Sequence, residues 1–166
     1  MSDYLLTQIR AIEERVQNME ARAKSRFSGA RVYRTTNKSI LDSTITAIDF
    51  DAERYDTDNY HSTVSNTTRF TAPKTGKYHI GGAIVWDANA TGRRQLSIRL
   101  NGSATLGIQQ VAAVSSIFPP AQVIGVDYQL NAGQYIELRV YQDSTITIDI
   151  LSTAALSPEF WIHFLG

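Results

Sequence analysis

The chain has 166 residues, which is enough for one domain with a sizeable hydrophobic core. Its 16 basic residues (Lys and Arg) balance 16 acidic ones, so the formal net charge is zero. No basic run exceeds the pair Arg93-Arg94. We therefore expect no nucleic-acid partner, because duplex binding needs a concentrated basic patch. The sequence has no cysteine, which excludes disulfides, thiolate metal sites and a cysteine nucleophile.

The start of the chain, Met1-Ser2-Asp3-Tyr4, has no cationic segment leading into an apolar stretch, so no signal peptide is seen. No window approaches the ~20 apolar residues that a membrane-spanning helix needs. The expectation is a protein that is neither inserted in a membrane nor secreted by the general route.

Residues 3–26 predict one helix, because they contain no Gly or Pro and are rich in good helix formers. Ser2 or Asp3 is the expected N-cap, and Gly29 lies just past the expected end. The apolar residues step alternately by four and three, the period of a heptad seam. Leu5, Ile12 and Met19 occupy d positions of this seam, and Ile9, Val16 and Ala23 occupy a positions.

This register favours a parallel trimeric coiled coil. Arg15 at position g faces Glu20 at the next e position of a parallel neighbour. Ile9 and Ile12 at adjacent a and d positions lean towards three strands. Helices of this length are marginal alone in water, so an attached oligomerising domain would have to assist. The alternative interpretations are an ordinary helix packed on its own domain and an anchor to another protein.

From residue 30 onward, short alternating or β-branched stretches are separated by turn residues, and no second helical pattern follows. Such spacing predicts an all-β antiparallel sandwich or barrel. Several of these stretches are apolar on both faces, which predicts an oligomer interface. The expected strands are residues 30–34, 44–49, 69–71, 76–87, 94–100, 104–114, 121–130, 135–141, 145–151 and 159–165.

Residues 69–80 resemble the Phe-Thr-x-Pro-x-x-Gly-x-Tyr-x-Phe signature of the complement C1q globular head, a jelly roll of the tumour-necrosis-factor (TNF)-like type. Residues 128–138 and 160–166 resemble later strands of that head, although Ile162 stands where the family usually has glycine. The resemblance covers roughly residues 30–166. The matching positions, expected to be structural, are Phe70, Pro73, Gly76, Tyr78, Gly133, Phe160 and Phe164.

The resemblance implies a C1q/TNF-like jelly-roll sandwich that forms a compact homotrimer around a threefold axis. It divides the chain into residues 1–27, a coiled-coil or anchoring helix, and residues 28–166, the jelly-roll head. The heptad helix takes the place of the collagen stalk found in many members of that family.

The sequence contains no convergent catalytic set, so we expect no enzyme and no cofactor. His61, His79 and His163 are scattered and are expected at a surface or interface, where they would make assembly sensitive to pH. The acidic segment 49–59 contains Asp56 and Asp58, which are weak candidates for calcium ligands. A solvated acidic loop is the favoured interpretation of this segment. Residues 60–68 are rich in hydroxyl and amide groups, which suit the binding of a sugar or protein, with the aromatic ring of Tyr60 as a stacking platform, or equally an inert loop.

These observations predict a non-enzymatic homotrimeric structural or adhesive protein of a bacteriophage virion: a capsid decoration, head fibre or tail-fibre tip. Its expected partners are itself, other virion proteins, and a host-surface protein or glycan. The alternative is a bacterial C1q-like binding module at the cell surface or outside the cell. A jelly-roll enzyme with a metal site is disfavoured by the dispersed histidines.

Overall fold

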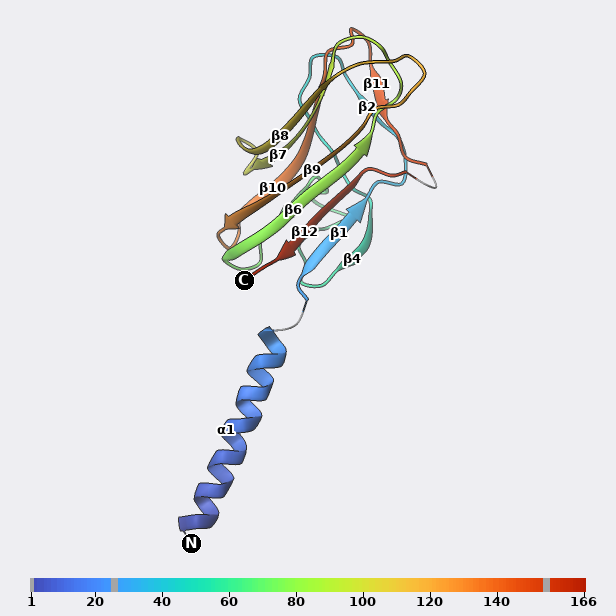
Figure 1. Cartoon of the computed structure of the whole chain (residues 1–166). Helices are drawn as coiled ribbons and strands as arrows, with labels where there is room; N and C mark the ends of the chain where they lie inside the picture. Colours follow the sequence, from blue (N-terminus) through green and yellow to red (C-terminus); the bar gives the residue numbers. More distant parts are fainter. Residues whose placement is uncertain (1, 25–26, 154–155) are drawn as a thin grey trace.

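The computed structural model describes residues 2–24, 27–153 and 156–166 and consists of one helix followed by a β sandwich (Figure 1). The helix is α1 (Ser2–Lys24). The strands are β1 (Gly29–Tyr33), β2 (Lys38–Ile40), β3 (Thr46–Ala47), β4 (Ala52–Asp56), β5 (Arg69–Thr71), β6 (Gly76–Val85), β7 (Arg93–Leu100), β8 (Ala104–Ala112), β9 (Ala121–Leu130), β10 (Tyr135–Gln142), β11 (Ile148–Ile150) and β12 (Glu159–Phe164).

Two antiparallel sheets form the sandwich. The first sheet has the strand order β4-β1-β12-β6-β9. The second sheet has the order β3-β10-β7-β8, and β5 also pairs with β10. A small third sheet joins β2 to β11. Neighbours that are far apart in sequence, such as β1 beside β12, give the crossed connections of a jelly roll. The all-β antiparallel sandwich expected from the sequence is confirmed.

Two strands were not predicted. The segment 49–59, read as an acidic loop, contains β4, and residues 38–40 form β2. Both strands pair on one side only, and their charged residues lack the β-branched alternation that marks a strand in sequence. The expected strands 44–49 and 145–151 are reduced to β3 and β11.

The helix exposes its apolar seam. Leu5 is 62% exposed, Ile9 45%, Ile12 59%, Val16 46% and Met19 68%, so the sandwich of the same chain does not cover them. The side chain of Ala23 lies outside the described residues. Within the part of the chain that the structure describes, no helix is long and apolar enough to cross a membrane.

Stacked aromatic rings join the two sheets in the core. The ring of Phe160 on β12 lies 4.6 Å from that of Phe70 on β5 and 5.8 Å from that of Phe50. All three side chains are almost completely buried. Offset stacking of this kind adds to the hydrophobic gain from burial.

A buried arginine closes one end of the core. Arg94 on β7 is fully buried with its guanidinium 5.8 Å from the ring of Trp86. It donates hydrogen bonds to the carbonyls of Thr91 at 3.0 Å and Asn89 at 3.3 Å. Burial lowers the pKa of Arg94 from its usual value. These bonds hold the turn between β6 and β7 over the core.

We predict that Phe160→Ala lowers the free energy of unfolding by about 3–5 kcal/mol, because it removes the ring between Phe50 and Phe70 and leaves a cavity. Urea titration followed by tryptophan fluorescence measures this loss. The control is Val64→Ala, since Val64 is 90% exposed and its truncation should change stability by less than about 0.5 kcal/mol. Equal losses in the two variants would contradict the prediction.

Candidate functional site

The middle part of the outward face of the first sheet carries apolar residues, most of which have small side chains. Strand register places Trp161, Gly81 and Gly125 in one cross-strand row. Trp161 lies against Gly81, because a Cβ on Gly81 would meet the indole ring at 2.4 Å. The adjacent rows add Ala83 beside Val123 and Val85 beside Ala121. We call these seven positions the apolar face.

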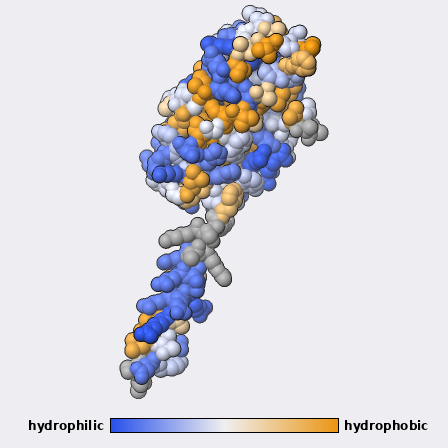
Figure 2. Space-filling view, in the orientation of Figure 1, coloured by the Kyte–Doolittle hydropathy of each residue, from blue (hydrophilic) through white to orange (hydrophobic). Residues whose placement is uncertain are grey.

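The apolar face is open in the single chain. Val123 is 61% exposed, and Ala121 and Gly125 are exposed as well. Figure 2 views this side of the sandwich and shows apolar residues gathered over its middle and upper parts. An antiparallel sheet that faces water normally alternates apolar and polar residues, so an apolar outward face indicates an interface.

A row of polar and aromatic residues borders the apolar face near the start of β1. His163 and His79 are cross-strand neighbours, and Asp127 is the next neighbour of His79. The Tyr55 hydroxyl lies 2.8 Å from His163 Nε2, and His79 Nδ1 lies 2.8 Å from an Asp127 carboxylate oxygen. The two imidazole rings stack with their centres 6.3 Å apart. We call these four residues the histidine row.

The histidine row disfavours a proton on His163. Burial lowers the pKa of His163, and the nearby His79 and Arg31 lower it further. The ring of Phe27 packs edge-on against it at 5.4 Å. The neutral imidazole is therefore the form that the folded chain holds near neutral pH.

An ion-pair cluster lies on the other side of the apolar face. Arg31 and Arg54 both bind the carboxylate of Glu159, whose side chain is 10% exposed. The Arg54 Nε donates to Glu159 Oε1 at 2.8 Å, and its guanidinium lies over the ring of Tyr33 at 4.5 Å. These contacts tie β4, β1 and β12 together.

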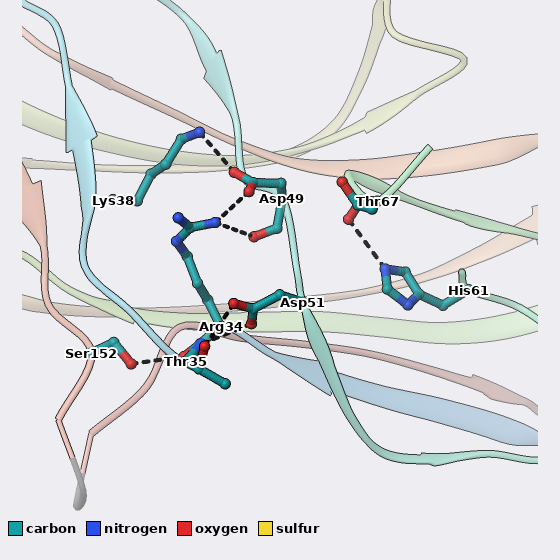
Figure 3. A network of polar contacts seen from close by, with 8 residues as sticks. All are labelled: Arg34, Thr35, Lys38, Asp49, Asp51, His61, Thr67 and Ser152. Atoms are coloured by element: carbon teal, nitrogen blue, oxygen red, sulfur yellow. Dashed lines mark hydrogen bonds and ion pairs between the residues drawn. The ribbon is translucent and has the colours of Figure 1, made fainter. Parts of the chain in front are cut away.

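A second polar network holds the connection after β1 (Figure 3). Arg34 and Lys38 both pair with the carboxylate of Asp49, Lys38 at 2.7 Å. The backbone N–H and hydroxyl of Thr35 donate to Asp51 at 2.8 and 2.6 Å. Burial raises the pKa of Asp49, but the hydrogen bond from Lys38 and the charge of Arg34 outweigh it and hold the pKa below its usual value. All of these carboxylates act as structural partners.

The residues singled out by the family resemblance lie in the core and its turns. The hydroxyl of the buried Tyr78 donates to the carbonyl of Lys74 at 2.7 Å, and burial raises the pKa of Tyr78 to about 12. Pro73 lies in the bend that leads into β6. Gly76 leaves room for Phe164, since a Cβ there would lie 2.3 Å from that ring.

Gly133 has a different role, because its backbone φ of +83° lies in the left-handed region that favours glycine. It forms the turn between β9 and β10. Gly133 therefore shapes a turn, whereas Phe70, Phe160 and Phe164 pack inside the sandwich.

The calcium candidates Asp56 and Asp58 form hydrogen bonds within the turn after β4. Asp56 accepts hydrogen bonds from the backbone N–H groups of Asp58 at 3.2 Å, Tyr60 at 3.0 Å and His61 at 2.8 Å. The hydroxyl of Thr57 donates to Asp58 at 3.0 Å. In the described ranges, no three His, Asp or Glu side chains gather where they could hold a metal. Asp56 thus serves as a backbone cap for the turn after β4.

The hydroxyl-rich segment 60–68 differs from its sequence reading in its aromatic residue. Tyr60 is 1% exposed, its hydroxyl lies 2.7 Å from that of Ser28, and its ring packs edge-on against Tyr78. It therefore offers no surface platform. His61 is also held, between Glu53 at 3.0 Å and the carbonyl of Thr67 at 3.1 Å.

Sequence reasoning did not single out Tyr55, Asp127 or Gly125 for either the histidine row or the apolar face. Tyr55 lies on β4, which was not predicted as a strand. The one local signal was the small-residue run Gly81-Gly82-Ala83 in a strand otherwise rich in large side chains. This run indicates that other groups approach the strand closely, but it does not identify those groups.

The fold has known counterparts. No protein-family model matches the chain, and no curated protein is significantly similar in sequence. Among solved structures, murine APRIL at pH 8.0 is similar with a TM-score of 0.64 at 12% identity, over 84% of this chain and 100% of that chain. The globular domain of zebrafish complement 1qA gives 0.62 at 12%, over 85% and 98%. Eiger TNF from S. frugiperda gives 0.61 at 14%, over 84% and 93%. The chain therefore has a TNF-like jelly-roll fold.

We predict that acid destabilises the protein through His163. Its pKa is lowered in the folded chain, so the unfolded chain binds this proton at higher pH, and stability falls as the pH drops below about 6.5. Urea titrations at pH 7.5 and pH 5, at one protein concentration, should show a larger loss for the wild type than for His163→Gln. Equal losses in the two proteins would rule out this role of His163.

Proposed function

We propose that the protein is a non-enzymatic homotrimeric adhesive module, in which an N-terminal parallel coiled coil carries three jelly-roll heads. The observation that carries this proposal is the open apolar face on the first sheet. Neighbouring copies of the chain around a threefold axis are its proposed cover, as the resemblance to the trimeric C1q head implies.

The energetics support this use of the apolar face. Covering an exposed apolar side chain such as Val123 contributes at most about 1.5–3 kcal/mol when it becomes fully buried. The exposed Gly125 allows a neighbour's side chains to approach the backbone closely. The same assembly places the histidine row at the trimer interface, where its charge state affects association.

The exposed apolar seam of α1 also supports a threefold assembly. Its seam from Leu5 to Met19 is exposed along its length, and α1 ends five residues before β1 begins. Because β1 belongs to the first sheet, three heads joined through that sheet bring three helices close together. Coiled-coil formation then buries the seam.

The proposed setting is a bacteriophage virion, as a capsid decoration, head fibre or tail-fibre tip. The features that support it are the short N-terminal helix with its exposed apolar seam, the absence of cysteine and the open apolar face of the jelly-roll head. The proposed partners are neighbouring virion proteins and a host-surface molecule. Three weak head contacts on one stalk act together as a stronger attachment.

The first test is the native mass by light scattering of the full chain and of a version that begins at Ser28. We expect a trimer for both, because the heads associate through the apolar face and the helix adds to that association. A trimeric full chain with a monomeric truncation would assign assembly to the helix alone. A monomer in both cases would overturn the proposal.

We also predict that Val123→Glu in the version beginning at Ser28 converts the trimer to a folded monomer. Val123 is 61% exposed in the single chain, so the variant folds, but a charge buried at the interface opposes association. Light scattering and circular dichroism report the two properties. The matched control is Val64→Glu at a residue that is 90% exposed and outside the face; dissociation of both variants would argue against this interface.

A further inference from the structure

The outward face of the second sheet, on the opposite side of the sandwich, gathers arginines that are scattered in the sequence. Glu137 on β10 has Arg69 on β5 as its neighbour on one side and Arg99 on β7 as its neighbour on the other. Side chains of directly paired residues lie on the same side of a sheet. Arg139, two residues along β10, joins them. We call Arg69, Arg99 and Arg139 the arginine cluster.

The arginine cluster carries more positive charge than its surroundings neutralise. Arg139 donates to Glu137 Oε2 from Nε at 3.0 Å and from Nη2 at 2.7 Å. Glu137 Oε1 accepts the hydroxyl of Thr68 at 3.0 Å. Among the described residues, neither Arg69 nor Arg99 forms an ion pair. Three arginines thus share one neighbouring carboxylate, which within the described chain pairs with Arg139 alone, and two positive charges remain in excess.

Two donors of this cluster are buried and unsatisfied. The Nε atoms of Arg69 and Arg99 are shielded from solvent and have no hydrogen-bond partner among the described residues. Arg99 uses Nη1 on the carbonyl of Ser103 at 2.9 Å, and the guanidinium of Arg69 lies 4.5 Å from the ring centre of Tyr135. Unsatisfied buried donors are uncommon in folded proteins, and water or a ligand can satisfy them.

Arg69 also lines a polar hollow of about 150 Å³ next to the cluster. The segment 60–68 supplies much of the wall, including Ser62, Ser65 and Asn66, and Asn59 adds a second amide. The lining contains no carboxylate. Hydroxyl and amide groups around a hollow can donate to and accept from the hydroxyls of a sugar, while the guanidinium matches a carboxylate in two parallel hydrogen bonds.

We propose that this surface binds an acidic saccharide, with a sugar ring in the hollow and its carboxylate groups on Arg69 and Arg99. The proposal rests on the adhesive function above and names its ligand class. The two arginines belong to strands on either side of β10, about 10 Å apart. This spacing favours a chain with successive acidic groups over a single small anion.

Charge and shape favour a saccharide over other acidic polymers. Arg69 covers one face of the Tyr135 ring, which removes it as a stacking platform for nucleic-acid bases. The hollow is lined mainly by hydroxyl and amide side chains, together with Tyr60 and His61, and among the described residues its lining contains no aliphatic side chain that would receive an apolar peptide residue. The site lies on the opposite sheet from the apolar face, so a trimer presents three copies outward.

The test is calorimetric titration of the full chain with oligogalacturonate, and with maltohexaose as the neutral control. We expect one site per chain for oligogalacturonate and no heat from maltohexaose. Arg69→Gln and Arg99→Gln should each weaken binding about ten- to a hundredfold, because each removes charge-assisted hydrogen bonds. The charge-matched control Arg10→Gln, at an outward helix position, should bind as the wild type does.

Two further variants test the same site even if one of the arginine-to-glutamine variants fails to fold. Arg69→Lys keeps the charge but loses the planar fork, so its affinity should fall between those of the wild type and Arg69→Gln. Asn66→Asp places a carboxylate in the hollow at a backbone φ of +53° that Asp tolerates, and should abolish binding with the melting temperature unchanged.

Wild-type affinity in Arg69→Gln or Asn66→Asp would overturn the proposal. So would the absence of heat with oligogalacturonate, or equal binding of polyglutamate or single-stranded DNA. Light scattering of the same samples separates this outcome from failure of the assembly model. A monomer that binds oligogalacturonate keeps the saccharide site and rejects the trimer, whereas a trimer that does not bind it rejects the site alone.

Discussion

Strand β6 and its pairing with β12 and β9 constrain the rest of the structure. Because side chains alternate along a strand, Tyr78, Ile80 and Ile84 point into the core while His79 and Gly81 point outward. A shift of one residue would exchange the two sets and place the core residues in water. The aromatic stack of Phe160 on β12 with Phe70 on β5 joins this sheet to the other. One register therefore sets both the core and the proposed trimer interface.

The two outward faces of the sandwich differ in character, and this difference matches the two roles proposed for them. The first sheet presents small and apolar residues such as Gly125 and Val123, which suit a flat contact with a second copy. The second sheet presents arginines around Glu137, which suit a hydrated anionic ligand. A homotrimer that displays a binding surface needs this division, since a face buried in assembly cannot also bind a host molecule.

Most of the polar side chains described above form hydrogen bonds or ion pairs that stabilise the turns and connections of the sandwich. Asp56 caps the turn after β4, and Asp49 ties Arg34 to Lys38. Candidates such as Asp56 attract attention in sequence because acidic residues also bind metals, but their hydrogen bonds to backbone N–H groups give them a structural role. Arg69 differs from Arg34, because its guanidinium forms no ion pair with a carboxylate in the described part of the chain.

The sequence by itself determined the heptad helix, the all-β class and the C1q-like turn around Pro73 and Gly76, because each depends on residues close together in the chain. It also predicted most strands in the sandwich, but not β4, whose charged residues become a strand only by pairing with β1. The tertiary structure alone decided which distant residues meet. Arg69, Arg99 and Glu137 are separated by about thirty to seventy positions in the chain, and strand pairing places them in one row. No local pattern carries that information, because cross-strand neighbours are set by topology and register.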